Sequence, residues 1–380
     1  MGVMTFRTRL AKTCLAGVSS TSLLLLSHAQ GSEPDFKKWG KETMDVLQKD
    51  LWMPKEKLYA ERADVESGKR DHASFMWGVG VQLTAMTAAA EVEPDNYLKP
   101  TTNYADAIQS YWVKHKDVEG FDVQPNPKNP DRYYDDNAWL VLALAEVFEL
   151  TGDKKYLDQS IATFRFVMSG ADEKLGGGLY WREKHLTSKN TCTNAPAIVS
   201  ALRLHQLTKD DSYLDTAKDI YAWTCKTMQN EDGLFWDNIK LDGKIDRRTF
   251  SYNSALMIRA NCLFHEITEE QRYLKEAQRI AKASEKRWIR ENGALADSGR
   301  FGHLLLESFL ELHDRDDDSH WQEVVKTSLV HLHEQMRDEN GRYPHHWARR
   351  RPGPLKETFL LNQASPARIY WLAAQDFAKD

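Results

Sequence analysis

Cysteine and net positive charge are both scarce in this sequence, and each shortage excludes a class of function. Three of its four cysteines, Cys192, Cys225 and Cys262, lie beyond the N-terminal segment at wide spacings, and no Cys-x-x-Cys pair occurs. This pattern does not indicate a zinc site or a disulfide framework, so we expect small buried apolar residues and leave one disulfide among the three open. The formal net charge of −5 provides no basic field for nucleic acid. Because phosphate-binding glycine loops and histidine-rich ligand spacings are lacking too, we predict no metal, no cofactor and no nucleic-acid partner.

A secretory leader is indicated by the first 29 residues. Basic residues between positions 7 and 12 precede an apolar stretch, Cys14–Leu26, and Ser27-His28-Ala29 places small residues where a signal peptidase cuts. The apolar stretch is too short to span a bilayer. We expect cleavage before Gln30, a secreted or periplasmic chain with no membrane span, and a single domain from residue 30 to 380.

An internal repeat predicts the architecture. Tyr-Leu pairs that begin at Tyr97, Tyr156, Tyr213 and Tyr273 recur about every 57 to 60 residues. Each pair follows the polar turn in a unit made of an apolar helix, a short polar turn and an amphipathic helix with a 3.6-residue period. Apolar inner helices are expected to begin near residues 72, 134, 190, 250, 299 and 360, and outer helices near 97, 154, 211, 271 and 319, with a sixth at about 35–50.

Six helical hairpins of this kind predict an all-α fold, an (α/α)6 barrel. An open solenoid would require polar capping repeats at its two ends, and the sequence shows none. Turns from inner to outer helix are short, as in Thr151-Gly152-Asp153, whereas the return connections run to roughly 10 to 25 residues and hold most exposed aromatics. Function concentrates on long loops held by a rigid scaffold, so the active face should carry the N-termini of the inner helices.

Two adjacent carboxylates, Asp135 and Asp136, lie on that face between Tyr134 and Trp139. Glycoside hydrolysis needs two carboxylates flanking one bond, and aromatic faces stack on sugar rings. Neighbouring residues on a helix diverge by about 100°, so the two carboxyls should stand at the shorter separation typical of retaining enzymes. Mutual repulsion should keep one of them protonated as an acid. The alternative is that both simply cap a helix.

Further sugar contacts are expected from the long loops. A glycine-rich loop presents aromatic rings and leads to amide and amine donors, a hairpin around Asp242-Gly243 follows, and an aromatic–amide pair opens the next inner helix. The predicted substrate-binding residues are Tyr134, Trp139, Tyr180, Trp181, Lys189, Asn190, Asn194, Trp236, Tyr252 and Asn253. Helix capping by Asn190, and core packing of the aromatic residues, are the alternatives.

The sequence also contains a histidine at the start of an inner helix and a short basic run near the C-terminus. His303 is expected to face the barrel from a plainly capped helix. The basic run Arg349-Arg350-Arg351 is expected to form a solvated loop, with contact to an acidic or phosphorylated glycan as the alternative.

The segment 134–139 resembles the paired-aspartate signature of glycoside hydrolase family 76, the endo-α-1,6-mannanases. Later blocks match in order and spacing, namely Lys189-Asn190-Thr191 with Asn194 and Pro196, Gly233-Leu234 and Ser251-Tyr252-Asn253. The resemblance implies an (α/α)6 barrel, α-mannan as the partner, and retaining hydrolysis of α-1,6-linked mannose by a monomer. It implies Asp135 as nucleophile and Asp136 as general acid/base.

The sequence departs from that family at two places. Phe301-Gly302-His303 stands where the family has Phe-Lys-Gly, and Ser254 stands where a larger amide is expected. An N-acylglucosamine 2-epimerase-like or unsaturated uronyl hydrolase-like enzyme, or a secreted glycan-binding protein without catalysis, are the alternative functions. The leader and the intact Asp pair argue against them, whereas His303 favours the epimerase.

Overall fold

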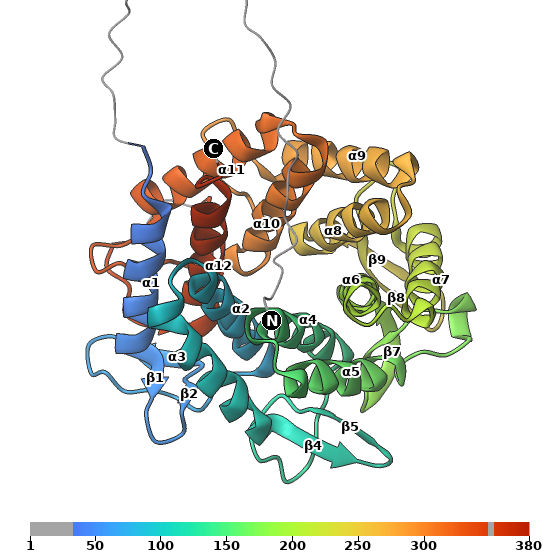
Figure 1. Cartoon of the computed structure of the whole chain (residues 1–380), viewed down its shortest axis with the longest axis horizontal. Coiled ribbons are helices and arrows are strands. Elements are labelled where there is room, and N and C mark those ends of the chain that lie inside the picture. The colour runs from blue at the N-terminus through green and yellow to red at the C-terminus, as the bar shows by residue number, and fades with distance from the viewer. Residues whose placement is uncertain (1–32, 349–352, 380) are drawn as a thin grey trace, which may run out of the picture. The chain divides into compact units, whose positions relative to one another are not determined.

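Twelve helices form two concentric rings in the computed structural model, which describes residues 33–348 and 353–379 (Figure 1). The inner ring consists of α2 (Met76–Val92), α4 (Tyr134–Thr151), α6 (Thr191–Thr208), α8 (Ser251–Thr268), α10 (Gly299–Asp316) and α12 (Leu360–Asp376). The outer ring consists of α1 (Phe36–Leu51), α3 (Pro94–Ala107), α5 (Lys154–Met168), α7 (Asp211–Met228), α9 (Gln271–Trp288) and α11 (Ser319–His331). The expected leader and the run Arg349-Arg350-Arg351 lie outside the described residues.

The inner ring is closed, which confirms the predicted (α/α)6 barrel. Each inner helix contacts the next, and α12 returns to contact α2, while α1 packs against α12. In α6, 13 of 18 residues are buried, against 6 of 18 in α9. A helix enclosed on all sides must be apolar all round, whereas an outer helix buries one stripe, so the sequence pattern distinguishes the rings. Within the described residues, no helix is long and apolar enough to cross a membrane.

Short turns join inner to outer helices at one end of the barrel. Gly152, Lys209, Glu269 and Asp317 each follow the last residue of an inner helix with a left-handed backbone, at φ of 69°, 62°, 59° and 55°. A left-handed residue at this position ends a helix, and glycine adopts it without a Cβ penalty.

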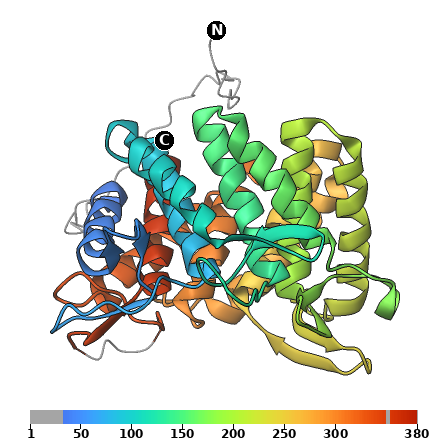
Figure 2. The same cartoon turned by 90° about the horizontal axis from the view of Figure 1, so that it is seen from below.

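All strands lie in the long connections at the other end (Figure 2). Their bounds are β1 (Trp52–Met53), β2 (Leu58–Tyr59), β3 (Arg62–Asp64), β4 (Trp112–His115), β5 (Val118–Phe121), β6 (Tyr180–Arg182), β7 (His185–Asn190), β8 (Trp236–Lys240), β9 (Ile245–Thr249) and β10 (Glu357–Phe359). The expected hairpin around Asp242-Gly243 is β8–β9. It joins β6 and β7 in a four-stranded antiparallel sheet, which the sequence did not predict.

Side-chain amides anchor the long connections to the inner helices. The fourth residue of α4, α6 and α12 is an amide that accepts from the backbone N–H and donates to the backbone C=O of one residue in the preceding connection. The pairs are Asn137 with Phe121 (2.8 and 2.9 Å), Asn194 with Leu179 (2.9 and 3.2 Å) and Gln363 with Tyr343 (3.0 and 2.9 Å). We call these contacts amide clamps. In α8 the same position is Ser254, which accepts a single bond of 3.4 Å from the Phe235 N–H.

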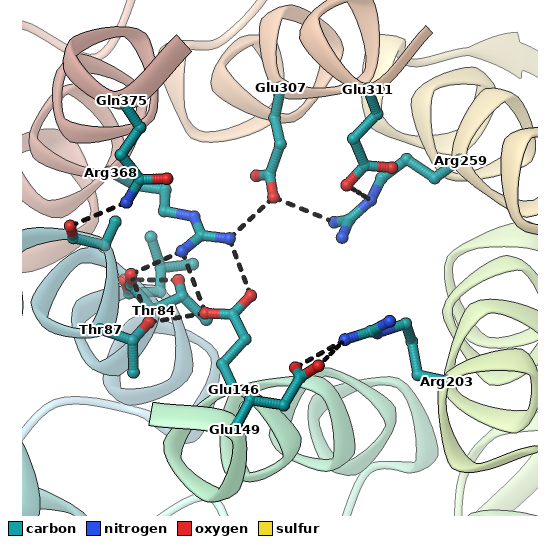
Figure 3. Close-up of polar contacts among 12 residues, drawn as sticks. Thr84, Thr87, Glu146, Glu149, Arg203, Arg259, Glu307, Glu311, Arg368 and Gln375 are labelled. Atoms are coloured by element: carbon teal, nitrogen blue, oxygen red, sulfur yellow. Dashed lines mark hydrogen bonds and ion pairs between the residues drawn. The ribbon is translucent and has the colours of Figure 1, made fainter. Parts of the chain in front are cut away.

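Charged side chains from several inner helices meet inside the barrel (Figure 3). Arg368 of α12 donates to Glu146 of α4 at 2.8 Å and to Glu307 of α10 at 2.9 Å. Arg259 of α8 pairs with Glu307 at 3.3 Å and with Glu311 at 2.9 Å. Four of the six inner helices are therefore linked through one ionic network.

Candidate active site

Asp135 and Asp136 occupy the first turn of α4, at the end of the barrel that carries the long connections. Tyr133 is the N-cap residue and its side chain makes no capping bond. Asp135 Oδ1 accepts the N–H of Asp136 at 3.0 Å. The first-turn backbone thus contacts Asp135, whereas no backbone donor among the described residues contacts the carboxylate of Asp136.

The second oxygen of Asp135 is held by other elements. Trp181 Nε1 donates to Asp135 Oδ2 at 2.8 Å, and the Cys192 thiol lies 3.5 Å from the same oxygen. Burial raises the pKa of Asp135 to about 6, while the bonds from Trp181, Asp136 and Cys192 oppose that rise by stabilising the ionised form. Asp135 is thus a carboxylate with its charge supported from two sides.

Asp136 has a different environment. No donor among the described residues lies within hydrogen-bonding distance of its carboxylate, and burial together with the charges of Asp135 and Asp131 raises its pKa well above the usual range. Asp131 is itself ion-paired with Arg182 of β6. The negative charge of Asp135 raises the pKa of Asp136, whereas hydrogen-bond donors oppose the rise at Asp135, so the two carboxyls have different environments.

Tyr252 of α8 connects this pair to an aromatic group. Its hydroxyl hydrogen-bonds the Cys192 thiol, and burial followed by the charges of Cys192, Asp237 and Asp135 raises the pKa of Tyr252 well above 10. The Tyr252 ring stacks on Phe301 of α10 at 4.3 Å between centroids, and Phe301 stacks on Trp77 of α2 at 5.6 Å. We call Trp77, Phe301 and Tyr252 the aromatic bar, because they connect three inner helices at their N-terminal ends.

Three other predicted aromatic contacts are placed on the same face. Trp181 is 40% exposed and meets the Tyr133 ring edge-on at 5.1 Å. Trp139, one turn below the Asp pair, and Trp236 on β8 are both partly buried against the core. The Arg247 guanidinium lies 5.4 Å from the Trp236 ring centroid. Direct sugar contact by these residues stays a prediction.

Two predicted contact residues are buried in the core. Tyr134 is buried and stacks on Phe166 of α5 at 4.9 Å. Tyr180 is buried in the same small cluster, and its hydroxyl donates to Asp172 at 2.8 Å. Both rings point behind the start of α4, because neighbouring side chains on a helix or strand point in different directions. Contact of either ring with substrate stays a prediction.

Lys189 and Asn194 also make contacts within the protein framework. Lys189 is fully buried, and its ammonium donates to three backbone carbonyls in the 172–177 loop at 2.6 to 2.9 Å and pairs with Asp172 at 2.7 Å. Asn194 forms one of the amide clamps and also donates to Asn190 O at 2.8 Å. The donor groups of both side chains have partners within the protein, and contact of either residue with a sugar stays a prediction.

Asn190 and Asn253 are also enclosed. Asn190 occupies the N-cap position of α6, where its side chain accepts from Ser188 Oγ at 2.7 Å and makes no capping bond. Asn253 is fully buried, and its amide has no hydrogen-bond partner among the described residues. Contact of either residue with substrate stays a prediction.

His303 and two of the three cysteines are buried, as expected, whereas Cys225 is half-buried. His303 is buried within α10, which Ser298 caps, and burial lowers the pKa of His303 to about 4. Cys192, Cys225 and Cys262 are free thiols, two buried and one half-buried. A cavity of about 500 Å³ lies at the opposite end, lined by His265, Glu266, Glu269, Gln271, Asp314 and Arg315, and contains no predicted site residue.

Several residues near the Asp pair were not predicted from the sequence as site residues. Asp131, Arg182 and Asp237 shape the charge of the site, and Trp77 and Phe301 supply two thirds of the aromatic bar. Tyr-Tyr-Asp-Asp pointed to the helix start, but the Asp131–Arg182 pair joins residues 51 positions apart, and no local pattern indicates such a contact. The aromatic bar likewise depends on ring closure.

Comparisons with known proteins identify the family and the fold. A family model described as "Glycosyl hydrolase family 76" matches residues 41–340. A GH76 alpha-mannanase of Bacteroides thetaiotaomicron is 30% identical in a structural superposition with a TM-score of 0.86 that covers 91% of this chain and 97% of that one. An inactive variant of an alpha-1,6-mannanase of Salegentibacter sp. HEL1_6, with two consecutive aspartates changed to asparagine and bound to alpha-1,6-mannotriose, superposes at 22% identity and a TM-score of 0.77, over 90% of this chain and all of that one.

A curated relative extends the comparison to yeasts. The mannan endo-1,6-alpha-mannosidase DCW1 of Candida albicans is 24% identical over 206 residues, which are 51% of this chain and 41% of the relative. The chain spans about half the length of the curated relatives it matches.

Proposed function

The chain belongs to glycosyl hydrolase family 76, and on this premise we propose that it cleaves α-1,6-mannosidic linkages in α-mannan with retention of configuration. The names of its relatives, which are alpha-mannanases or mannan endo-1,6-alpha-mannosidases, support this substrate. The observation that carries the proposal is the asymmetry of the Asp pair: Asp135 has its charge supported by Trp181, and Asp136 has its proton retained by burial and two negative neighbours. The inactive double variant of the Salegentibacter enzyme supports the assignment to two consecutive aspartates.

The two carboxyls divide the reaction between them. Asp135, ionised above a pH of about 6, attacks the anomeric carbon and forms a glycosyl-enzyme, while Asp136 protonates the departing oxygen. Asp136, then ionised, takes a proton from water, and the resulting hydroxide displaces Asp135 with a second inversion, which gives net retention. The Trp181 N–H orients Asp135 and stabilises its charge.

In this proposal the chain acts outside the cytoplasm, which rests on the leader-like N-terminal sequence. The lowered pKa of His303 and its burial leave it neutral and enclosed, which disfavours the epimerase alternative.

Amide and alanine replacements test the proposal on linear α-1,6-mannan. Asp135→Asn and Asp136→Asn should each lower kcat by about a thousandfold or more, because the charge or the proton is lost while size is kept. With an activated mannoside and azide, Asp136→Ala should return an α-mannosyl azide and Asp135→Ala a β-mannosyl azide. Asp153→Asn, a helix cap at the far end, is the matched control and should remain fully active. Near-normal hydrolysis by both amide variants would overturn the proposal.

A further inference from the structure

Arg300 is the exception among the arginines of this barrel. Nine arginines in the described residues are buried or half-buried, and eight of them pair with a carboxylate within 4.0 Å. The eight are Arg132, Arg182, Arg203, Arg259, Arg315, Arg337, Arg342 and Arg368. Arg300 alone has no such partner in the described part of the chain. A half-buried cation without a counter-charge costs free energy, so the exception calls for a ligand.

Only one of the three nitrogens of the Arg300 guanidinium has a hydrogen-bond acceptor among the described residues. Its Nε donates to Asn362 Oδ1 of α12 at 2.9 Å, and its Cζ lies 5.7 Å from the Phe359 ring centroid. The two terminal nitrogens have no acceptor among the described residues. Burial lowers the pKa of Arg300, and the one opposing charge is Glu61, whose carboxylate accepts from Ser74 Oγ and the Phe75 N–H instead of pairing with Arg300.

The position of Arg300 relates it to the Asp pair. It directly precedes Phe301, the middle ring of the aromatic bar, whose last ring reaches Asp135 through Cys192. The face therefore carries carboxylates at the start of α4 and an unpaired cation at the start of α10, with stacked rings between them. An anionic group on a bound glycan would be repelled by the first end and attracted to the second.

We propose that Arg300, with Asn362 and the aromatic bar, forms a subsite for a negatively charged substituent of the mannan chain, either a phosphate ester or a carboxylate. Two free amino groups in a planar fork match the paired oxygens of both anions. The inference rests on the proposed function, because it assumes that a mannan lies across this face.

Matched substrates test the subsite. In the first arm, the specificity ratio is kcat/KM on a phosphorylated α-1,6-mannan divided by kcat/KM on the same mannan after enzymatic dephosphorylation. In the second arm, it is kcat/KM on a mannan whose terminal primary alcohols are oxidised to carboxylates, divided by kcat/KM on the same mannan before oxidation. We expect a ratio of about ten or more in at least one arm, carried mainly by KM and declining as salt rises. Arg300→Gln should bring it to about one, whereas Arg300→Lys should keep part of it. Arg165→Gln, which removes an exposed cation of outer helix α5, should change nothing.

The outcomes separate the two proposals. A preference in one arm only identifies the anion. Hydrolysis of neutral mannan with a ratio near one in both arms, or a ratio that Arg300→Gln leaves intact, overturns the subsite and leaves the proposed function standing. Failure to hydrolyse any mannan overturns the proposed function and the subsite together. Thermal melting of Arg300→Gln, at the wild-type temperature within a few degrees, verifies that the variant is folded.

Discussion

Asp135 and Asp136 are neighbours in sequence, but their surroundings make them chemically different residues. Asp135 receives hydrogen bonds from Trp181 and from the next backbone N–H, which oppose the effect of burial. Burial raises the pKa of Asp136, and the negative charges of Asp135 and Asp131 raise it further. The difference between the two carboxyls therefore depends partly on contacts from outside α4, namely those of Trp181 and Cys192 with Asp135.

Trp181→Phe should reveal the contribution of one of those contacts. The ring is kept but the N–H is lost, so the ionised form of Asp135 loses a donor and its pKa should rise above about 6. The acidic limb of the kcat/KM profile should then move to higher pH by about half a unit to one unit. Trp236→Phe, which removes an indole N–H elsewhere on the face, is the control. An unchanged acidic limb in Trp181→Phe would show that the bond does not stabilise Asp135 in solution.

At the scale of elements, the amide clamps explain how long loops keep their place on a helical scaffold. A clamp satisfies both backbone groups of one loop residue, which would otherwise be buried without partners. The clamp at Asn194 holds Leu179, two residues before Trp181, so the framework of α6 positions the donor to Asp135. The position of Trp181 thus depends on a side chain of the neighbouring inner helix.

Replacing clamps of different strength should separate their contributions to stability. Asn194→Ala removes three hydrogen bonds and leaves the buried N–H and C=O of Leu179 unsatisfied, so it should lower the free energy of unfolding by about 3 kcal/mol. Ser254→Ala, at the corresponding position of α8, removes a single 3.4 Å bond and should cost less than about 1 kcal/mol. Urea denaturation measures both, and equal losses would contradict the clamp interpretation.

At the scale of the whole molecule, the ionic network joins helices that are remote in sequence. Arg368 lies 222 residues from Glu146 and 61 from Glu307, and the three meet inside the barrel. Charges from Arg368 and Arg259 lower the pKa of Glu307 to about 2 despite its burial. Closing the ring brings these charges together, and pairing them makes their burial tolerable.

Arg368→Met should destabilise the barrel by about 3 to 5 kcal/mol at neutral pH, because Glu146 and Glu307 lose their shared partner. Arg203→Met, which breaks the more exposed pair with Glu149, should cost about 1 kcal/mol or less. Urea denaturation at pH 7 compares them. Similar losses in the two variants would show that the network contributes no more than a surface pair.

The loss of stability in Arg368→Met should also depend on pH. The folded pKa of Glu307, about 2, lies below its usual 4.5, so its stabilisation is complete above about pH 4.5 and is lost as pH falls toward 2. The raised pKa values of the Asp pair act in the opposite direction in both proteins and cancel in the comparison. The difference in unfolding free energy between wild type and Arg368→Met should therefore shrink on acidification below pH 4.5.

The sequence by itself determined the twelve-helix barrel, the end that carries the long loops and the position of the Asp pair. These features depend on local patterns, namely a repeat of about 58 residues, apolar inner helices and short turns, which act within one or two helices. Even the β8–β9 hairpin followed from its Asp-Gly turn.

Only the tertiary structure decided which polar residues face the substrate side and which serve the framework. Lys189, Asn194 and Tyr180 looked like sugar ligands in the sequence, but their partners are backbone groups and carboxylates in a loop 8 to 17 residues away. The unpaired state of Arg300 is likewise visible only once the ring has closed. Burial and pairing depend on which loops meet in space, and a residue type in one sequence does not contain that information.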